Sequence, residues 1–150
     1  MNKTFSIWTR WSERAGLTNL NYPGVYALAI SRTDLSGQPF SWKREIVYIG
    51  MTNAKGGLKS RLQQFDNTIK GGDGHGGGHR VRFKHQYYTK LSKHLYVSVC
   101  PQKCDVTSNA PSDLMVMGKV ANHEYECLAV FVEAFGYLPE FNDKQRSPKK

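Results

Sequence analysis

Two tyrosines in this chain stand in short motifs with glycine, where a phenol could take part in chemistry. The motifs are Gly24-Val25-Tyr26 and Val47-Tyr48-Ile49-Gly50. A tyrosine on a strand is more often a packing residue than a catalyst, because its ring is a large apolar body. Its phenol has an ordinary pKa of about 10 and is a poor base at neutral pH unless a neighbouring cation favours the phenolate. The chemistry of this pair therefore depends on the charged groups that lie beside it.

One glutamate stands on the apolar side of the last predicted helix, which runs from about residue 113 or 116 to 135. The apolar stripe of this helix, at about 100° per residue, consists of Leu128, Phe131, Val132 and Phe135. Glu124 falls on this stripe, whereas Glu126 and Glu133 point largely the other way. An unpaired buried carboxylate is costly, and a metal ion and an arginine would satisfy it. We therefore expect Glu124 to be the metal ligand.

The two tyrosine motifs together resemble those of the GIY-YIG nuclease family, whose name comes from these tripeptides. The segment Leu58-Lys59-Ser60-Arg61-Leu62 is similar to the arginine-bearing helix that follows in the family. Pro139-Glu140-Phe141-Asn142 is similar to its terminal proline and asparagine, so the resemblance covers residues 22 to 142. The chain departs from the family in two places. The first motif reads Gly-Val-Tyr, and Met51 stands where relatives often carry lysine, so one phosphate contact would be missing.

The resemblance implies a metal-dependent endonuclease that hydrolyses phosphodiester bonds in DNA. Tyr26 would be the base that activates water, and Tyr48 would position water or phosphate. Arg61 would donate a forked pair of hydrogen bonds to the phosphate oxygens. Glu124 would hold one Mg²⁺, for which Mn²⁺ could substitute, and Asn142 would orient the site or a phosphate.

Glycines crowd the segment from Lys70 to Arg80. Glycine at this density disfavours a helix, so we expect a mobile loop, which could become ordered on binding DNA. Some restriction-type members of the family carry a histidine near glycines, which makes His75 a candidate catalytic ligand of the phosphate or the leaving group. Alternatively, His75 and His79 only decorate a disordered loop, and both interpretations stay open. Their spacing would suit a metal only on a helix, which the glycines disfavour.

The charge of the chain favours a polyanionic partner. There are 21 Lys and Arg against 12 Asp and Glu, which gives a formal net charge of +9, and cationic side chains displace the counterions condensed on phosphates. We expect DNA to contact a set of cationic side chains in and around the basic segment that follows the glycines: Lys59, His79, Arg80, Arg82, Lys84 and Lys90. Tyr87 and Tyr88, which interleave with this segment, are expected to pack rather than to stack on bases.

Other classes of protein fit the sequence less well. The longest apolar stretches, such as residues 25 to 30, are too short to cross a membrane, and the N-terminus has no apolar signal core, so we expect a cytoplasmic location. Three cysteines argue against a secreted disulfide framework. Cys100 and Cys104 could hold a metal, but no second Cys/His pair at zinc-finger spacing accompanies them.

The sequence predicts that the strands and helices which position these residues form one α+β domain. Strands are predicted over 24–31, 45–50 and 94–100, with helices over 58–69, over the basic segment after residue 80, and up to residue 135. Residues 31–44 would form a long hairpin tip, 1–20 a helical extension and 143–150 a basic tail. The prediction is a core of about residues 22–142, built on a small three-stranded, mainly antiparallel sheet flanked by helices.

The leading hypothesis is therefore a DNA endonuclease, with restriction, phage defence, degradation of host DNA and repair-type nicking all open. One site per chain would cut one strand, so a double-strand break would need a homodimer or two sequential attacks. The rival hypothesis is a catalytically inactive DNA-binding module of the same fold. A protein that only binds DNA would gain nothing from Glu124, because a carboxylate on the apolar stripe of the helix repels phosphate. RNA binding or cleavage is a weaker alternative, because no usual aromatic RNA-binding motif is present.

Overall fold

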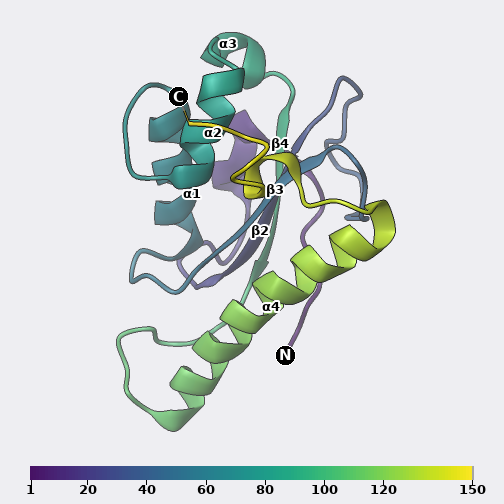
Figure 1. Ribbon diagram of the computed structural model, residues 1–150. Helices are drawn as coiled ribbons and strands as arrows, with labels where there is room; N and C mark the ends of the chain where they lie inside the picture. The colour runs from purple at the N-terminus through teal and green to yellow at the C-terminus, as the bar shows by residue number, and fades with distance from the viewer. Residues whose placement is uncertain (150) are drawn as a thin grey trace.

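A four-stranded antiparallel sheet lies at the centre of the computed structural model, which describes residues 1–149 (Figure 1). Its strands are β1 (Thr9–Arg10), β2 (Gly24–Ile30), β3 (Ile46–Thr52) and β4 (Leu95–Pro101), in the order β1-β4-β2-β3. The α+β class, the hairpin and the three predicted strands are confirmed. The fourth strand, β1, was not predicted, because two residues are too few to show a periodic pattern.

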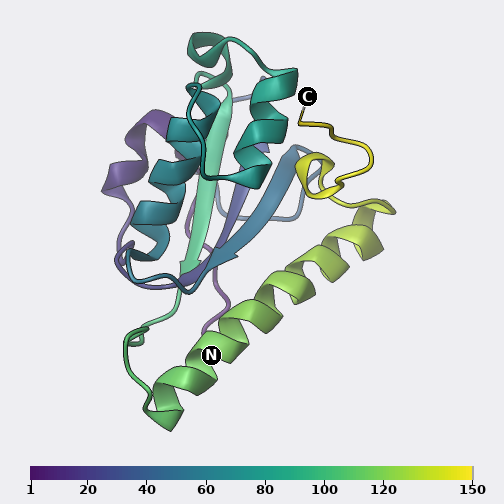
Figure 2. The ribbon, with the colours of Figure 1, turned by 60° about the vertical axis from the view of Figure 1, so that its left-hand side comes forward.

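Helices cover both faces of the sheet. They are the 3-10 helix η1 (Trp11–Gly16), α1 (Gly57–Ile69), α2 (Gly76–Lys84), α3 (Tyr88–Leu91), α4 (Pro111–Phe135) and the 3-10 helix η2 (Glu140–Asn142). Figure 2 shows α1 and α2 on one face and α4 crossing the other, with its first turns extending beyond the sheet. In the described part of the chain, no helix is long and apolar enough to cross a membrane.

The alternation of side chains along β2 divides the interior into two hydrophobic clusters. Tyr26 and Leu28 point to the face covered by α1, where they join Leu58, Leu62 and Phe65. The intervening residues of β2 point to the face covered by α4, where this second cluster gathers Val25, Ala27, Ala29, Val120, Cys127 and Phe131. Because side chains on a strand alternate with a period of two, this register alone places the phenol of Tyr26 on the side of α1 and α2.

The N-terminal segment contains the predicted short helix, as the 3-10 helix η1 ending at Gly16, and also contributes β1 and two tryptophans to the core. Trp8 and Trp11 are both 0% exposed. Trp8 packs in the cluster beneath α4, and Trp11 packs in the cluster beneath α1, where its ring meets Phe65 edge-on. Burying two tryptophans contributes several kcal/mol, roughly 2–3 kcal/mol for each large apolar side chain. Residues 1–20 are therefore as much a part of the fold as the sheet.

The expectation of a mobile glycine loop over residues 70–80 is wrong for residues 76–80, which form the first part of α2, and the predicted helix after residue 80 is confirmed for residues 81–84. Two of the glycines in α2 lie where a side chain would collide with the rest of the fold. A Cβ on Gly77 would lie 2.5 Å from the ring of Tyr48, and a Cβ on Gly78 would lie 2.9 Å from Cβ of Thr68. These glycines let the helix approach β3 and α1 closely, and the packing offsets the backbone entropy that glycine loses in a helix.

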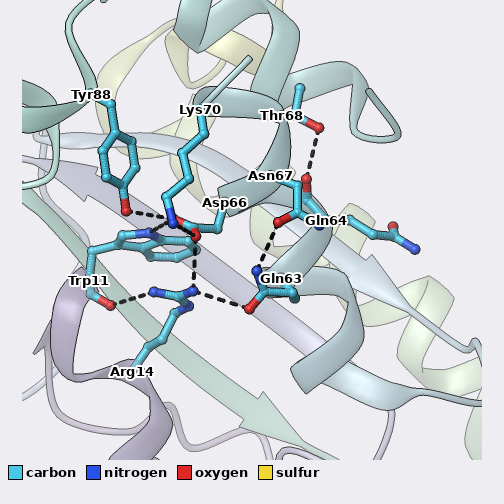
Figure 3. A network of polar contacts seen from close by, with 9 residues as sticks. All are labelled: Trp11, Arg14, Gln63, Gln64, Asp66, Asn67, Thr68, Lys70 and Tyr88. Atoms are coloured by element: carbon cyan, nitrogen blue, oxygen red, sulfur yellow. Dashed lines mark hydrogen bonds and ion pairs between the residues drawn. The ribbon is translucent and has the colours of Figure 1, made fainter. Parts of the chain in front are cut away.

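A buried carboxylate ties η1, α1 and α3 together (Figure 3). Oδ1 of Asp66 accepts hydrogen bonds from Nε1 of Trp11 at 2.7 Å and from the hydroxyl of Tyr88 at 2.8 Å. Its Oδ2 lies 2.8 Å from Nζ of Lys70 and 3.3 Å from the guanidinium of Arg14. Burial by itself would raise the pKa of Asp66, but the hydrogen bonds from Lys70, Trp11 and Tyr88 outweigh it and lower the pKa.

We predict that Asp66→Asn lowers the free energy of unfolding by about 2–4 kcal/mol at pH 7, because the ion pairs of Oδ2 with Lys70 and Arg14 are lost and an amide N–H would face these two cations instead. Since the pKa of Asp66 is depressed in the folded chain, its contribution is present above the unfolded pKa of about 4 and fades as the pH falls through the folded pKa. Urea unfolding of both proteins at several pH values measures the difference.

The matched control is Asp73→Asn, whose side chain is 96% exposed. It should leave the stability within about 0.5 kcal/mol of that of the wild type. Equal stability of the Asp66→Asn variant and the wild type at pH 7, or a difference that grows as the pH falls, would contradict the role given to Asp66.

Candidate active site

Tyr26 stands fully buried in the middle of the sheet, opposite a glycine. In the register of β2 and β3, Tyr26 pairs with Gly50. A Cβ at Gly50 would lie 2.5 Å from both Cζ and Oη of Tyr26, so only glycine leaves room for the phenol. Gly24 has the same role on the other side, since its Cβ would collide with the carbonyl oxygen of Cys100 on β4. The glycines of both tyrosine motifs are therefore required by close packing.

His75 reaches the phenol from the start of α2. It is 1% exposed, and its Nε2 lies 2.7 Å from Oη of Tyr26. Its Nδ1 accepts a hydrogen bond from the backbone N–H of Gly78 at 3.1 Å, which caps the helix. The neutral ring therefore carries its proton on Nε2 and donates it to Tyr26. Of the two interpretations of His75, the structure contradicts the loop decoration, because the side chain is buried and hydrogen bonded.

The protonation of this pair follows from its burial. Burial, together with the charge of Arg61, lowers the pKa of His75 to about 3, so the ring is neutral over the physiological range. Burial also raises the pKa of Tyr26 well above its ordinary value, and the nearby Tyr48 adds to the rise. Arg61 pulls the pKa of Tyr26 down but does not outweigh burial. Arg61 thus favours the phenolate of Tyr26, but in the chain on its own burial keeps the phenol protonated.

Tyr48 lies beside this pair on β3. Its ring centroid lies 6.1 Å from that of Tyr26 and 5.4 Å from that of His75, and its ring packs on the backbone of Gly77. Burial raises the pKa of the Tyr48 phenol, while the charge of Arg61 opposes the rise. The two phenols and the imidazole therefore form one compact group carried by β2, β3 and the start of α2.

Arg61 and Glu124 bring charge to this group from two further helices. Arg61 lies on α1, where its Nη1 donates to Oε1 of Gln64 at 2.9 Å, and its charge acts on Tyr26, Tyr48 and Glu124 alike. Glu124 lies half-buried on α4, and burial raises the pKa of its carboxyl while Arg61 lowers it. The chain thus brings all four predicted residues and His75 together from five elements.

Glu126, the rival carboxylate, lies on the surface. Its Oε2 lies 2.7 Å from Nζ of Lys3, and this hydrogen bond lowers the pKa of the Glu126 carboxyl. Glu124, by contrast, forms no hydrogen bond or ion pair with any residue from 1 to 149. A half-buried carboxylate without a donor fits a hard divalent cation whose other ligands are water and phosphate oxygens. Over the same residues there is no cluster of three or more His, Cys, Asp or Glu that could hold a metal, Cys100 and Cys104 included.

Asn142 holds the outer side of β3 rather than facing the phenols. Its Oδ1 accepts the backbone N–H of Ile49 at 2.9 Å, and its Nδ2 donates to the carbonyl of Ile49 at 2.8 Å. Ile49 stands between Tyr48 and Gly50, so this pair of hydrogen bonds sets the strand that carries both. With its oxygen and one N–H engaged by Ile49, the amide of Asn142 is held against β3, and of its two expected roles this contact favours orienting the site.

The residues expected to contact DNA divide into a buried one and an exposed group. Arg80 is 8% exposed, its Nη1 donates to the carbonyl of Phe141 at 3.5 Å, and its charge lowers the pKa of Tyr48 against the effect of burial. It therefore belongs to the site and not to the surface, which the sequence could have shown only if α2 had been recognised as a helix. The remaining members are exposed or half-exposed: Lys59, His79, Arg82, Lys84 and Lys90.

Two members of this exposed group already have an acidic partner within the chain. Lys84 is paired with Glu140 at 2.6 Å, and His79 lies 3.2 Å from the carboxylate of Asp73.

Tyr88 packs as expected, with its hydroxyl on Asp66. Tyr87 does not, because 70% of it is exposed. The expectation that both tyrosines pack is thus confirmed for one and wrong for the other.

The close contact between α2 and Tyr48 leads to a prediction that opposes helix propensity. Alanine is favoured over glycine within a helix by about 1 kcal/mol, yet Gly77→Ala would place a Cβ 2.5 Å from the Tyr48 ring. We expect this variant to lose about 1–3 kcal/mol of unfolding free energy through overpacking. Thermal and urea unfolding measure it.

Gly76→Ala is the control, because its Cβ would meet only flexible side chains, the nearest of them Nζ of Lys149 at 3.6 Å. It should be neutral or slightly stabilising. If the two alanine variants were equally stable, Gly77 would not be a packing requirement and the close approach of α2 to β3 would have to be revised.

No protein-family model, no curated protein and no solved structure matches this chain. The resemblance to the GIY-YIG family therefore rests on its own residues. They are the two glycine–tyrosine motifs, Arg61, Glu124 and Asn142, together with the geometry that joins them.

Proposed function

We propose that this chain is a metal-dependent DNA endonuclease that hydrolyses phosphodiester bonds. The observation that carries the proposal is that the buried phenol of Tyr26, the half-buried phenol of Tyr48, a guanidinium and an unpaired half-buried carboxylate lie close enough for their charges to act on one another. Phosphodiester hydrolysis needs an activated water, stabilisation of the charge on a pentacoordinate phosphorus, and help for the leaving oxygen. The residues gathered here have the chemistry for the first two, a cation held by Glu124 would supply the third, and the net charge of +9 suits a polyanionic substrate.

The hydrogen bond from His75 determines what Tyr26 can do. Because Nε2–H donates into Oη, the phenolic proton of Tyr26 points away from the imidazole, toward any water beside it. When that proton is lost to solvent water, Nε2–H and the charge of Arg61 stabilise the phenolate, which can then take a proton from the attacking water and become a phenol again. His75 is not the base, since its Nδ1 is engaged by Gly78 and its pKa is lowered to about 3.

Arg61 and Glu124 act on the phosphate group. The guanidinium of Arg61 can donate two parallel hydrogen bonds to non-bridging oxygens, which become more negative in the transition state. A divalent cation held by Glu124, Mg²⁺ with Mn²⁺ as a substitute, would supply Lewis-acid stabilisation of the same charge. Tyr48 lies beside Tyr26 and would position the water or the phosphate. One such site per chain cuts one strand, so a single chain would produce nicks.

We predict metal-dependent nicking of supercoiled plasmid that is lost in Glu124→Ala and retained in Glu126→Ala. Glu126 lies two residues away on the same helix but is paired with Lys3 at the surface, which makes it the matched control. Removal of a group that acts on the charge of the transition state costs on the order of 100-fold or more in rate. A plasmid-relaxation assay with Mg²⁺, Mn²⁺ or EDTA, at equal folded concentration, measures both variants.

The outcomes of this assay separate the proposal from its alternatives. Loss of nicking only in Glu126→Ala would keep the nuclease and overturn the assignment of the metal ligand. Tight DNA binding by the wild type without cleavage of plasmid or of sequence-diverse DNA would favour the inactive binding module instead. Cleavage of RNA but not of DNA would overturn the substrate class.

The pH dependence of nicking tests the base. The pKa of Tyr26 is raised well above its ordinary value and the base is the deprotonated form, so the rate should rise steadily from pH 6 to about 9. No step near pH 6.5 should come from His75, whose pKa is lowered to about 3. Initial rates at saturating metal, with folding checked at each pH, measure the profile. A plateau above pH 7 would exclude Tyr26 as the base.

A further inference from the structure

Two exposed aromatic rings stand among cations on the outer surface of α2 and the turn that follows it. Phe83 is 43% exposed and Tyr87 is 70% exposed. Nζ of Lys90 lies 5.7 Å from the centroid of the Tyr87 ring, and Phe83 stands between Arg82 and Lys84 in the chain. Neither ring belongs to a hydrophobic cluster of the fold. Both rings therefore remain free to contact a partner.

A hollow of about 310 Å³ lies against Phe83. It is lined by His79, Arg82, Phe83, Gln86 and Lys149. His79, Arg82 and Phe83 recur at helical spacing on one face of α2, and Lys149 comes from the C-terminal segment. The lining offers cations for a phosphate, a flat ring for a base and an amide that can bond the edge of a base, which is the combination that holds a single nucleotide.

We propose that the hollow beside Phe83, together with Tyr87 four residues further along the chain, binds unpaired bases, so that the preferred substrate is DNA with single-stranded nucleotides within a few nucleotides of the scissile phosphate. This inference rests on the proposed function. In a duplex both faces of each base are covered by its neighbours, so an aromatic side chain can stack only on a base that is unpaired or terminal. The charge of Arg82 and Lys149 would hold the backbone of the same strand.

The position of this surface relative to the phenols supports a shared substrate. His75 caps the helix at Tyr26, and Phe83 lies eight residues further along it. At a rise of 1.5 Å per residue, the two positions are roughly 12 Å apart along the helix. Phosphates of one strand follow each other by about 3.4 Å along a duplex axis, so this surface falls within a few nucleotides of the cut.

The experiment measures binding, in EDTA, of the wild-type chain to three labelled DNAs: a blunt duplex, the same duplex with a short single-stranded extension, and the extension strand alone. Fluorescence anisotropy gives the affinity, and a fluorescent base analogue in the extension reports stacking through its quenching. The variants are Phe83→Ala and Tyr87→Ala. The control is Tyr125→Ala, an aromatic that is 73% exposed on α4, with Ala121 and Ala129 one turn before and after it.

We expect the wild type to bind the extended duplex more tightly than the blunt one and to quench the analogue. Phe83→Ala and Tyr87→Ala should each weaken binding of the extended duplex roughly tenfold, remove the quenching and leave the blunt duplex unchanged. Tyr125→Ala should leave both unchanged. Arg82→Ala should weaken binding to every DNA and reduce the slope of log affinity against log salt by about 1.

Equal affinity of the wild type for blunt and extended duplexes, or quenching that survives both aromatic substitutions, would overturn the inference. The failure of this inference and that of the proposed function are distinguishable. Nicking without a preference for unpaired bases would overturn only the proposed stacking surface. A preference for unpaired bases without metal-dependent nicking would overturn only the proposed nuclease activity. An absence of DNA binding would overturn both proposals.

Discussion

The backbone N–H of Gly78 donates a hydrogen bond to Nδ1 of His75, and this bond determines on which nitrogen the imidazole carries its proton. With Nδ1 occupied, Nε2 must face Tyr26 as a donor, so the phenol oxygen is an acceptor and its own proton is free to leave in another direction. The helix cap and the orientation of the catalytic candidate are thus one structural feature. If α2 did not start at His75, neither the tautomer nor the contact would be defined.

Glycine makes this arrangement sterically possible. Gly50 leaves space for the phenol of Tyr26, and Gly77 lets α2 rest on the ring of Tyr48. The same closeness removes water from the phenols, and desolvation outweighs the attraction of Arg61 in raising the pKa of Tyr26. A base that needs activation is therefore held in a protonated resting form, and the balance can shift only when substrate and cation bring new charge into the group.

Much of this organisation could be predicted from periodicity. The apolar run of β2 and the 3.6-residue period of α1 and α4 could be recognised in the sequence, and the apolar stripe of α4 singled out Glu124. Tyr26 and Arg61 were assigned by the resemblance instead. The first part of α2, residues 76–80, could not be predicted, because glycine density predicts disorder unless the surfaces that α2 packs against are known. The buried place of Arg80 followed from the same missing helix. β1 and the burial of Trp8 were also hidden, since they depend on contacts with segments distant in sequence.

The amide clamp of Asn142 has a consequence for solubility. β3 is the outer strand of the sheet, and an uncovered outer strand offers unpaired backbone groups to any other strand, including one from a second copy. Asn142 occupies the N–H and C=O of Ile49 as a neighbouring strand would, and η2 and α4 pack against the same strand. The residue that orients Tyr48 thereby also blocks edge-to-edge pairing, so loss of the C-terminal segment would convert a folded chain into one prone to intermolecular sheet formation and aggregation.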